Sequence, residues 1–405
     1  MYISMKAVGI IAEYNPLHDG HIYHLKEAVR LAGSDAVVVA MSGDYVQRGE
    51  PAILDKWERT QMALNNGADV VVEIPTLFCL GNAGQYANAA VQILESFNAV
   101  SHIAFGSESG DCNMLSRIAV NLDTQSDLIA AAVMEYVKSG YSYPRSRAAA
   151  YRELFPDDSD GYSILANPND ILAIEYIRAC KRLKPVAVKR VGADYSESVK
   201  DNYEYQSAGG IRKALQSNED IRNFVPPDVA AIILSAKLDG TLNTPDRWLK
   251  TLKFAIMRTS ADEIDNCPSG GEGLGNRIKS MVNSTATWDE MIESVKSKRY
   301  TYTRISRLFS QIILGISRDD YSSKEPQYVR ILGFSEKGRQ LISEMNPNGK
   351  IPFITNVNRQ GDMLCPEGLK QLALDIHAAD IYNLISSRDL YELSDYRHKP
   401  IIMTK

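Results

Sequence analysis

Short apolar runs alternate with longer helix-forming segments through the first half of the chain. The runs are apolar at nearly every position, which is typical of parallel strands covered on both faces. The predicted strands are Ala7 to Ala12, Ala36 to Met41, Val70 to Ile74, His102 to Phe105 and Val186 to Arg190. The predicted helices are Tyr23 to Leu31, Lys56 to Asn65, Asn82 to Phe97, Asp127 to Lys138 and Asp170 to Arg182. This alternation predicts a Rossmann-like α/β fold with a doubly wound parallel sheet, whose ligands bind beyond the carboxyl ends of the strands.

The pattern changes near Leu215, after which most segments favour helix. The predicted helices of this half are Asp228 to Leu238, Trp248 to Thr259, Gly275 to Val282, Trp288 to Lys298 and Arg304 to Ile316. We therefore predict two domains: an α/β domain over residues 1–216 and a mainly helical C-terminal domain over residues 217–405.

Composition narrows the class of protein. The chain has 405 residues, 44% of them apolar, and its 45 Lys+Arg against 50 Asp+Glu give a net charge of -5. These values argue against global disorder and against a generally basic nucleic-acid coat, although a local basic patch stays possible. We expect no membrane helix and no signal peptide, because the apolar stretch from Ala7 runs into Glu13 after a few residues. The five cysteines form no C-x-x-C pair, which favours a reducing cytoplasm and argues against a cysteine-built zinc site.

The end of the first predicted strand carries the strongest chemical signal. His18, His21 and His24 lie within seven residues, just before or inside a predicted helix. Gly20 lets the backbone approach a ligand, and a helix N-terminus suits a phosphate group. The segment from His18 to His21 resembles the H-x-G-H signature of the nucleotidyltransferase superfamily, in which the motif binds ATP phosphates and promotes attack on the α-phosphate. The structural alternative is a helix cap that carries surface histidines.

A second segment, from Ser207 to Arg212, precedes a predicted helix. It resembles the second signature of the superfamily, S-[ST]-x-x-[IV]-[RK]. The resemblance implies that the Ser207 hydroxyl and the helix N-terminus hold the β- and γ-phosphates, while Arg212 adds positive charge. Only one hydroxyl stands where two are common, and taken alone the segment is also typical of a capping turn.

Other polar or glycine positions follow the remaining strands. Gly106 could admit an adenine or ribose against bare backbone, Asn169 could bind a nucleotide or cap a helix, and Arg190 could neutralise phosphate or stack on a base. The loop from Met41 to Pro51 lies where substrate or metal–phosphate contacts are expected. Its charged residues could equally be solvated, and we assign no specific role to Asp44, Arg48 or Glu50.

Resemblance over the whole chain narrows the class further. The sequence resembles the bacterial tRNA(Met) cytidine acetate ligase family, and the matching segments occur in both halves in the same order. They are Val8 to His24, Met41 to Pro51, Phe105 to Glu108, Pro168 to Asp170, Glu272 to Ile278 and Lys298 to Leu308. One departure is Asp170, where the family often has an asparagine, so a role that needs an amide at this position is in doubt.

The resemblance implies an enzyme that adenylates acetate with ATP and then acetylates the exocyclic amine of the wobble cytidine in elongator tRNA-Met. His18 and His21 are the implied catalytic residues, ATP is a substrate, and Mg²⁺ is expected to accompany it. The positions implied to bind ATP are Ile11, Ala12, Glu13, Tyr14, Asn15, Pro16, Leu17, His18, Asp19, Gly20, His21, Ile22, Tyr23, His24, Gly106, Asn169, Arg190 and Val191, together with Ser207 and Arg212 of the second signature. The G-x-S-x-G nucleophile elbow does not occur in the sequence, which agrees with a reaction that modifies no side chain.

An RNA partner predicts a local basic surface despite the negative net charge. The stretch from Lys296 to Arg307 interleaves cations with Tyr300 and Tyr302, so that phosphates could bind the cations and bases could stack on the rings. The predicted RNA-binding residues are Lys298, Arg299, Arg304 and Arg307. The alternative is a solvated helix end with tyrosines in the core.

Two other functions stay open at this point. A mononucleotide adenylyltransferase would share the motif, but such enzymes are usually one compact domain. A non-catalytic RNA-binding protein could retain the nucleotide site as a structural feature. The oligomeric state is unknown from the sequence.

Overall fold

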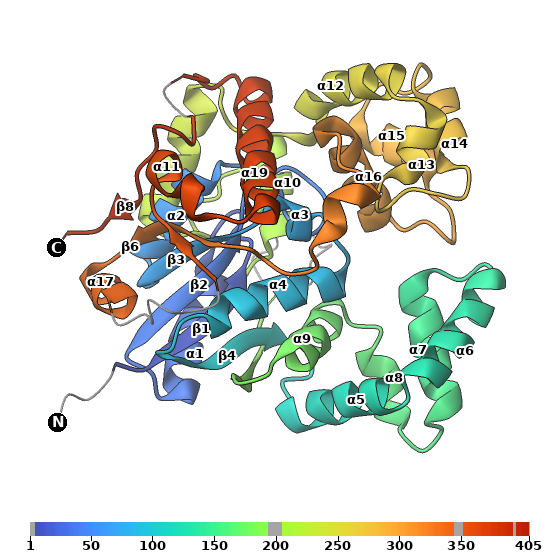
Figure 1. Ribbon diagram of the computed structural model, residues 1–405, viewed down its shortest axis with the longest axis horizontal. Coiled ribbons are helices and arrows are strands. Elements are labelled where there is room, and N and C mark those ends of the chain that lie inside the picture. The colour runs from blue at the N-terminus through green and yellow to red at the C-terminus, as the bar shows by residue number, and fades with distance from the viewer. Residues whose placement is uncertain (1–4, 193–204, 344–350, 392–393, 405) are drawn as a thin grey trace.

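The computed structural model describes residues 5–192, 205–343, 351–391 and 394–404, and its centre is a mixed β-sheet (Figure 1). The strands are β1 (Ala7–Ala12), β2 (Ala36–Ser42), β3 (Val70–Ile74), β4 (Val100–Ser107), β5 (Lys184–Lys189), β6 (Val329–Phe334), β7 (Phe353–Ile354) and β8 (Ile401–Ile402). Their order is β5-β4-β1-β2-β3-β6-β7, and β8 also pairs with β6. The first five strands are parallel, whereas β6 runs antiparallel to β3. The strand order reverses between β1 and β4, which is where a doubly wound sheet binds its ligands.

Both faces of the sheet are covered, as the nearly continuous apolar runs predict. Along β2, Val38 and Ala40 enter one core, whereas Val37, Val39 and Met41 enter the other. The first core is shared with α3 (Thr76–Cys79), α4 (Ala83–Glu95), α5 (Cys112–Thr124) and α9 (Pro168–Ala179). The second is shared with α1 (Asp19–Ala32), α2 (Lys56–Asn65), α10 (Ala208–Gln216) and α11 (Pro227–Leu238). The predicted doubly wound α/β sheet is therefore confirmed.

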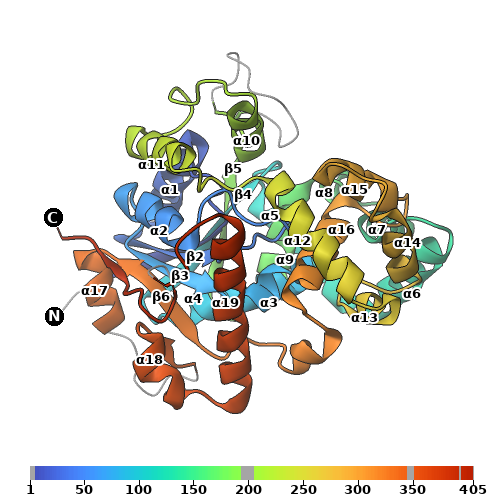
Figure 2. The ribbon, with the colours of Figure 1, turned by 90° about the horizontal axis from the view of Figure 1, so that it is seen from above.

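The other helices extend this frame. In Figures 1 and 2 the helices α12 to α16 gather beside the sheet, and in the view of Figure 1 α19 stands above the strands. The bounds are α6 (Ser126–Lys138), α7 (Tyr143–Leu154), α8 (Ser159–Ile164), α12 (Pro245–Arg258), α13 (Ala261–Asn266), α14 (Leu274–Met281), α15 (Trp288–Val295), α16 (Tyr302–Leu314), α17 (Glu336–Ser343), α18 (Val357–Gln360) and α19 (Pro366–Ile385), with 3-10 turns at Arg318–Ser322 and Gly361–Met363. No helix of the described segments combines the length and the apolar character that crossing a bilayer requires.

The strands predicted in the first half agree with the structure to within about two residues at most ends, but β6, β7 and β8 were not predicted. Two of these three strands have only two residues each, too few to show a periodic pattern. Residues beyond 217 thus contribute strands to the same sheet as residues 7–189. The division into residues 1–216 and 217–405 stays a prediction.

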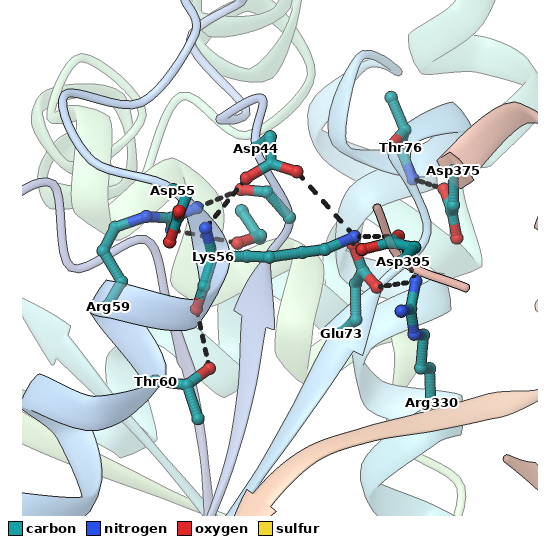
Figure 3. Close-up of polar contacts among 12 residues, drawn as sticks. Asp44, Asp55, Lys56, Arg59, Thr60, Glu73, Thr76, Arg330, Asp375 and Asp395 are labelled. Carbon is teal, nitrogen blue, oxygen red and sulfur yellow. Dashed lines mark hydrogen bonds and ion pairs between the residues drawn. The ribbon is translucent and has the colours of Figure 1, made fainter. Parts of the chain in front are cut away.

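A buried network of ion pairs joins the late part of the chain to the early strands (Figure 3). Lys56 Nζ lies 2.9 Å from Glu73 Oε1, 2.7 Å from Asp395 Oδ2 and 3.8 Å from Asp44 Oδ2. Arg330 on β6 pairs with the same Glu73 and Asp395 carboxylates. All five side chains are at most 4% exposed, so each charge depends on its partners for stabilisation.

Candidate functional site

A cavity of about 360 Å³ opens at the carboxyl ends of β1 and β4, where the strand order reverses. Most of the predicted nucleotide-binding residues line it, and they come from the β1–α1 junction, β4, α9, β5 and α10. They are Ile11, Ala12, Glu13, Tyr14, Asn15, His18, Gly20, His21, Tyr23, His24, Gly106, Asn169, Arg190, Val191, Ser207 and Arg212. The structure therefore brings together residues that lie up to 201 positions apart, from Ile11 to Arg212.

Four predicted positions do not line the cavity, namely Pro16, Leu17, Asp19 and Ile22. Leu17 is fully buried in the core that α1 shares with the sheet, and Ile22 packs against that core. Asp19 is the first residue of α1, and its N–H donates to the Phe224 carbonyl. Leu17 and Ile22 therefore anchor the β1–α1 junction in the core, and Asp19 anchors it through its backbone.

The side chains of the two motif histidines cap the N-terminus of α1 by accepting backbone N–H groups. His18 Nδ1 accepts a hydrogen bond from the Gly20 N–H at 3.1 Å, and His21 Nδ1 accepts one from the His18 N–H at 3.2 Å. The rings lie 3.8 Å apart between centroids. Because each Nδ1 accepts a hydrogen bond, each neutral ring carries its proton on Nε2. Nε2 is thus a hydrogen-bond donor in both residues, and both residues line the cavity.

Burial keeps these imidazoles neutral. It lowers the pKa of His18 to about 3, with Arg190 and Arg212 adding to the effect. Burial likewise lowers the pKa of His21 well below its usual value and lowers that of His24 to about 4. At neutral pH the pair therefore offers two neutral N–H donors at a helix N-terminus, a combination suited to a phosphate group.

Gly20 is required by the neighbouring histidine. A Cβ at this position would lie 2.9 Å from His18 Cε1 and 3.1 Å from His18 Nδ1. The sequence analysis expected Gly20 to admit a ligand to the backbone. The structure gives a further reason for the glycine, since any side chain would push the His18 ring out of its capping position.

The second signature lines the same cavity as the histidines, through Ser207 and Arg212. Ser207 caps α10, with its hydroxyl accepting from the Gly210 N–H at 3.1 Å, and the same residue lines the cavity. Arg212 Nη1 donates to the Asn15 carbonyl at 2.7 Å, and Arg212 Nη2 lies 3.9 Å from Glu50 Oε2. The capping turn is therefore present at the N-terminus of α10, and the phosphate-binding role of Ser207 and Arg212 stays a prediction.

Asn169 and Asp170 begin α9 against Glu108. The Glu108 carboxylate accepts from Asn169 Nδ2 at 2.6 Å and from the Asp170 N–H at 2.9 Å. Asp170 is fully buried and accepts from the Ser107 hydroxyl, the Ser109 N–H and Asn167 Nδ2. Because all three partners donate, a carboxylate fits where the family often has an amide, and this Asp170 side chain supports the turn rather than lining the cavity.

The Met41 to Pro51 loop approaches the cavity and is held by α16. Gln47 lines the cavity, and its carbonyl accepts from Arg307 Nη1 at 3.3 Å. Ser310 Oγ donates to the Gly49 carbonyl at 2.7 Å, and Tyr302 donates to Glu50 Oε1 at 2.9 Å. Gly49 has a φ of 90°, and a Cβ there would lie 2.2 Å from the Arg307 backbone nitrogen. The loop and α16 thus pack too closely for any residue but glycine.

The predicted RNA-binding residues are placed differently from one another. Lys298 is exposed, and Arg299 lies 2.7 Å from Glu272 at the surface. Arg304 donates to the Ser269 and Gly270 carbonyls, at 3.0 and 3.2 Å. Arg307 lines the nucleotide cavity. The basic stretch therefore contains two cations at the surface, Lys298 and Arg299, and two arginines, Arg304 and Arg307, that donate hydrogen bonds to backbone carbonyls.

Several residues that line the cavity were not predicted to bind a nucleotide. They are Gln47, Arg48, Ala83, Tyr86, Phe105, Pro168, Ile171, Leu172, Tyr176, Val188, Lys189, Tyr205, Gln206, Ala208, Thr303 and Arg307. Arg48 follows β2, where contacts were expected without an assigned role. The helix-borne members, such as Tyr86 and Tyr176, match ordinary core positions, so their pattern contained no signal for a site.

Similarity to known proteins extends over nearly the whole chain. The family model described as HIGH Nucleotidyl Transferase matches residues 5–395. A relative named tRNA(Met) cytidine acetate ligase, from Acetivibrio thermocellus, is 35% identical over 395 residues, covering 93% of this chain and 94% of the relative. A relative of the same name from Clostridium perfringens is 34% identical, with 98% of this chain and 100% of the relative covered.

Solved structures give the same result. The crystal structure of Thermotoga maritima TmcAL in its apo form I has a TM-score of 0.91 and 31% identity, covering 98% of this chain and 100% of that one. A second crystal structure of Thermotoga maritima TmcAL is bound with alpha-thio ATP. It has a TM-score of 0.89 and 32% identity, with 98% and 99% of the two chains covered.

Proposed function

Since the chain belongs to the tRNA(Met) cytidine acetate ligase family of HIGH nucleotidyltransferases, we propose that it is a ligase that activates acetate with ATP and acetylates a cytidine of elongator tRNA-Met. The acceptor is the exocyclic amine of the wobble cytidine. The observation that carries the proposal is the neutral pair of His18 and His21, two residues that line the cavity at the β1–α1 junction and whose Nδ1 atoms accept backbone hydrogen bonds.

The first step joins acetate to AMP. An acetate oxygen attacks the α-phosphorus of ATP, the bond from that phosphorus to the bridging oxygen of pyrophosphate breaks, and acetyladenylate forms. His18 and His21 donate from Nε2 to the phosphoryl oxygens, on which negative charge increases in the transition state. The N-terminus of α10 and Arg212 support the departing phosphates, and AMP then becomes the leaving group that acetate alone lacks.

Magnesium is proposed to enter with the nucleotide. Across the described ranges, no group of three or more His, Cys, Asp or Glu side chains is arranged to hold a metal ion. Mg²⁺ commonly binds through substrate phosphates with few protein ligands, so the ATP phosphates would hold it here and the ion would neutralise their charge. We place the enzyme in the cytoplasm, where ATP and tRNA are both present.

For the tRNA surface, we propose that Lys298 and Arg299 contact phosphates of the RNA. Replacing both with alanine is expected to weaken tRNA binding and to lower the slope of log affinity against log salt by about 2, since each phosphate contact releases about one counterion. Acetate-dependent pyrophosphate exchange should be unchanged. The control is Lys370→Ala, an exposed lysine on α19. A salt slope equal to that of the control would place the RNA elsewhere. The RNA-binding roles of Arg304 and Arg307 stay predictions, because both donate to backbone carbonyls within the protein.

Substrate dependence tests the proposed function directly. The purified enzyme with ATP and Mg²⁺ is expected to exchange pyrophosphate into ATP only when acetate is added, and to transfer labelled acetate to elongator tRNA-Met. Exchange that needs a phosphorylated mononucleotide in place of acetate would instead support an adenylyltransferase. Binding of tRNA with no adenylate formation from any carboxylate would support a non-catalytic RNA-binding protein.

A further inference from the structure

The cavity is strongly cationic, with one exception. Its lining includes five cations, Arg48, Lys189, Arg190, Arg212 and Arg307. Among the described lining residues, Glu13 is the single carboxylate. A carboxylate repels both acetate and the phosphates of ATP, so these anionic groups do not account for its presence.

Two hydrogen bonds position Glu13, one to its carboxylate and one to its backbone carbonyl. Glu13 Oε1 accepts a hydrogen bond from the Gln47 N–H at 2.9 Å. The Glu13 backbone carbonyl accepts from Arg59 Nη1 at 2.8 Å, and Arg59 is fully buried. Within the described residues Oε2 makes no hydrogen bond to the protein, so this oxygen is available to a ligand. Such positioning by hydrogen bonds from neighbouring protein groups is characteristic of a group that acts on a substrate.

The charge environment suits a proton acceptor. Burial raises the pKa of Glu13, while Arg48 and Arg212, together with the Gln47 N–H, lower it in part, and Glu50 raises it again. Tyr86 on α4 and Tyr176 on α9 also line the cavity and interact electrostatically with Glu13. A carboxylate whose pKa is raised toward neutrality takes up a proton more readily than an exposed one, provided that it is ionised at the start.

We propose that Glu13 binds the exocyclic amine of the target cytidine and accepts its proton during acetyl transfer. The N4 amine attacks the carbonyl carbon of acetyladenylate, forming the N–C bond. The bond from that carbon to the phosphate oxygen breaks, and AMP leaves with the electron pair. The amine loses one proton to Glu13 Oε2, which later releases it to solvent. Carboxylates are natural acceptors for a cytosine N4 amine.

This inference rests on the proposed function. Measuring acetate activation and acetyl transfer separately distinguishes a failure of the inference from a failure of the proposed function. Glu13→Gln keeps the size of the side chain and an oxygen for the Gln47 N–H, but it cannot take up a proton. We expect single-turnover transfer from preformed acetyladenylate to tRNA-Met to fall about 100-fold or more, a loss at least about 10-fold larger than any loss of acetate-dependent pyrophosphate exchange. The matched control is Glu27→Gln, which removes a surface charge paired with Arg30 on α1.

A pH profile distinguishes proton transfer from simple positioning. In the wild type the transfer rate is expected to rise with pH as Glu13 ionises and then to level off, and this rise should disappear in Glu13→Gln. Unchanged transfer, an unchanged profile, or an equal loss of exchange and transfer would each overturn the assignment. A wild-type enzyme that shows no acetate-dependent exchange would instead overturn the proposed function itself.

Discussion

Replacing His21 or His18 with alanine is expected to lower acetate-dependent pyrophosphate exchange by about 100-fold or more, the usual cost of removing one donor from a transition-state charge site. Each ring supplies an Nε2 proton because its Nδ1 accepts from the backbone. Exchange measured at saturating ATP and acetate would show the loss in turnover, since the missing contact strengthens as charge develops on phosphorus.

His18 also caps α1, so a second variant must separate catalysis from folding. Asparagine is among the best N-cap residues, and His18→Asn can accept from the Gly20 N–H while lacking the Nε2 donor. We expect His18→Asn to unfold at the wild-type urea concentration and still to have the low exchange rate of His18→Ala. Near-normal exchange in His18→Asn or in His21→Ala would contradict the assigned role.

The second large effect concerns stability. Among the residues that the structure describes, Lys56→Met removes the one lysine that pairs with Asp44, Glu73 and Asp395 and leaves Arg330 as the remaining cationic partner of Glu73 and Asp395. We expect the free energy of unfolding to fall by about 3–5 kcal/mol, because uncompensated charge stays buried. Urea unfolding at pH 7 measures this change.

The control for this variant is Lys296→Met, which breaks an exposed pair with Glu293 and should have little effect. Acid provides a further check on the wild type. Burial raises the pKa of Asp395, but Arg330 and Lys56 outweigh it and bring the value to about 2. The folded pKa lies below the unfolded one, so the resulting stability is present above about pH 4 and is lost as the pH falls toward 2. Equal destabilisation by Lys56→Met and Lys296→Met would refute the importance of the network.

The sequence predicted those parts of the site that are contiguous. His18, Gly20 and His21 follow one strand directly, so the local pattern alone locates them, and the order of strands and helices predicts the sheet edge where they lie. The role of Arg307 could not be found in this way, because its partner Gln47 lies 260 positions away. A basic stretch with interleaved tyrosines has the same pattern whether its arginines bind RNA or backbone carbonyls.

The ion-pair network is another feature that depends on contacts between residues far apart in the sequence. Glu73 stands in an otherwise apolar strand, and a charge in such a place indicates a buried partner. Its partners Lys56, Arg330 and Asp395 come from a helix, a late strand and a segment near the C-terminus. Pairing at this sequence separation depends on the tertiary fold, which single-sequence patterns do not encode.

The position of β6 in the sheet has a consequence for synthesis on the ribosome. A nascent chain that has exposed only residues up to 216 already contains both motif segments, His18 to His21 and Ser207 to Arg212, yet the outer edge of β3 has no partner until Val329–Phe334 emerges. Lys56 and Glu73 then still lack Asp395, which comes within the last eleven residues of the 405-residue chain. Long-range pairing of this kind delays assembly until late in translation. The sheet edge and the ion-pair network beside the early strands are therefore completed only after residue 395 has been made, although most of the residues that line the cavity precede residue 217.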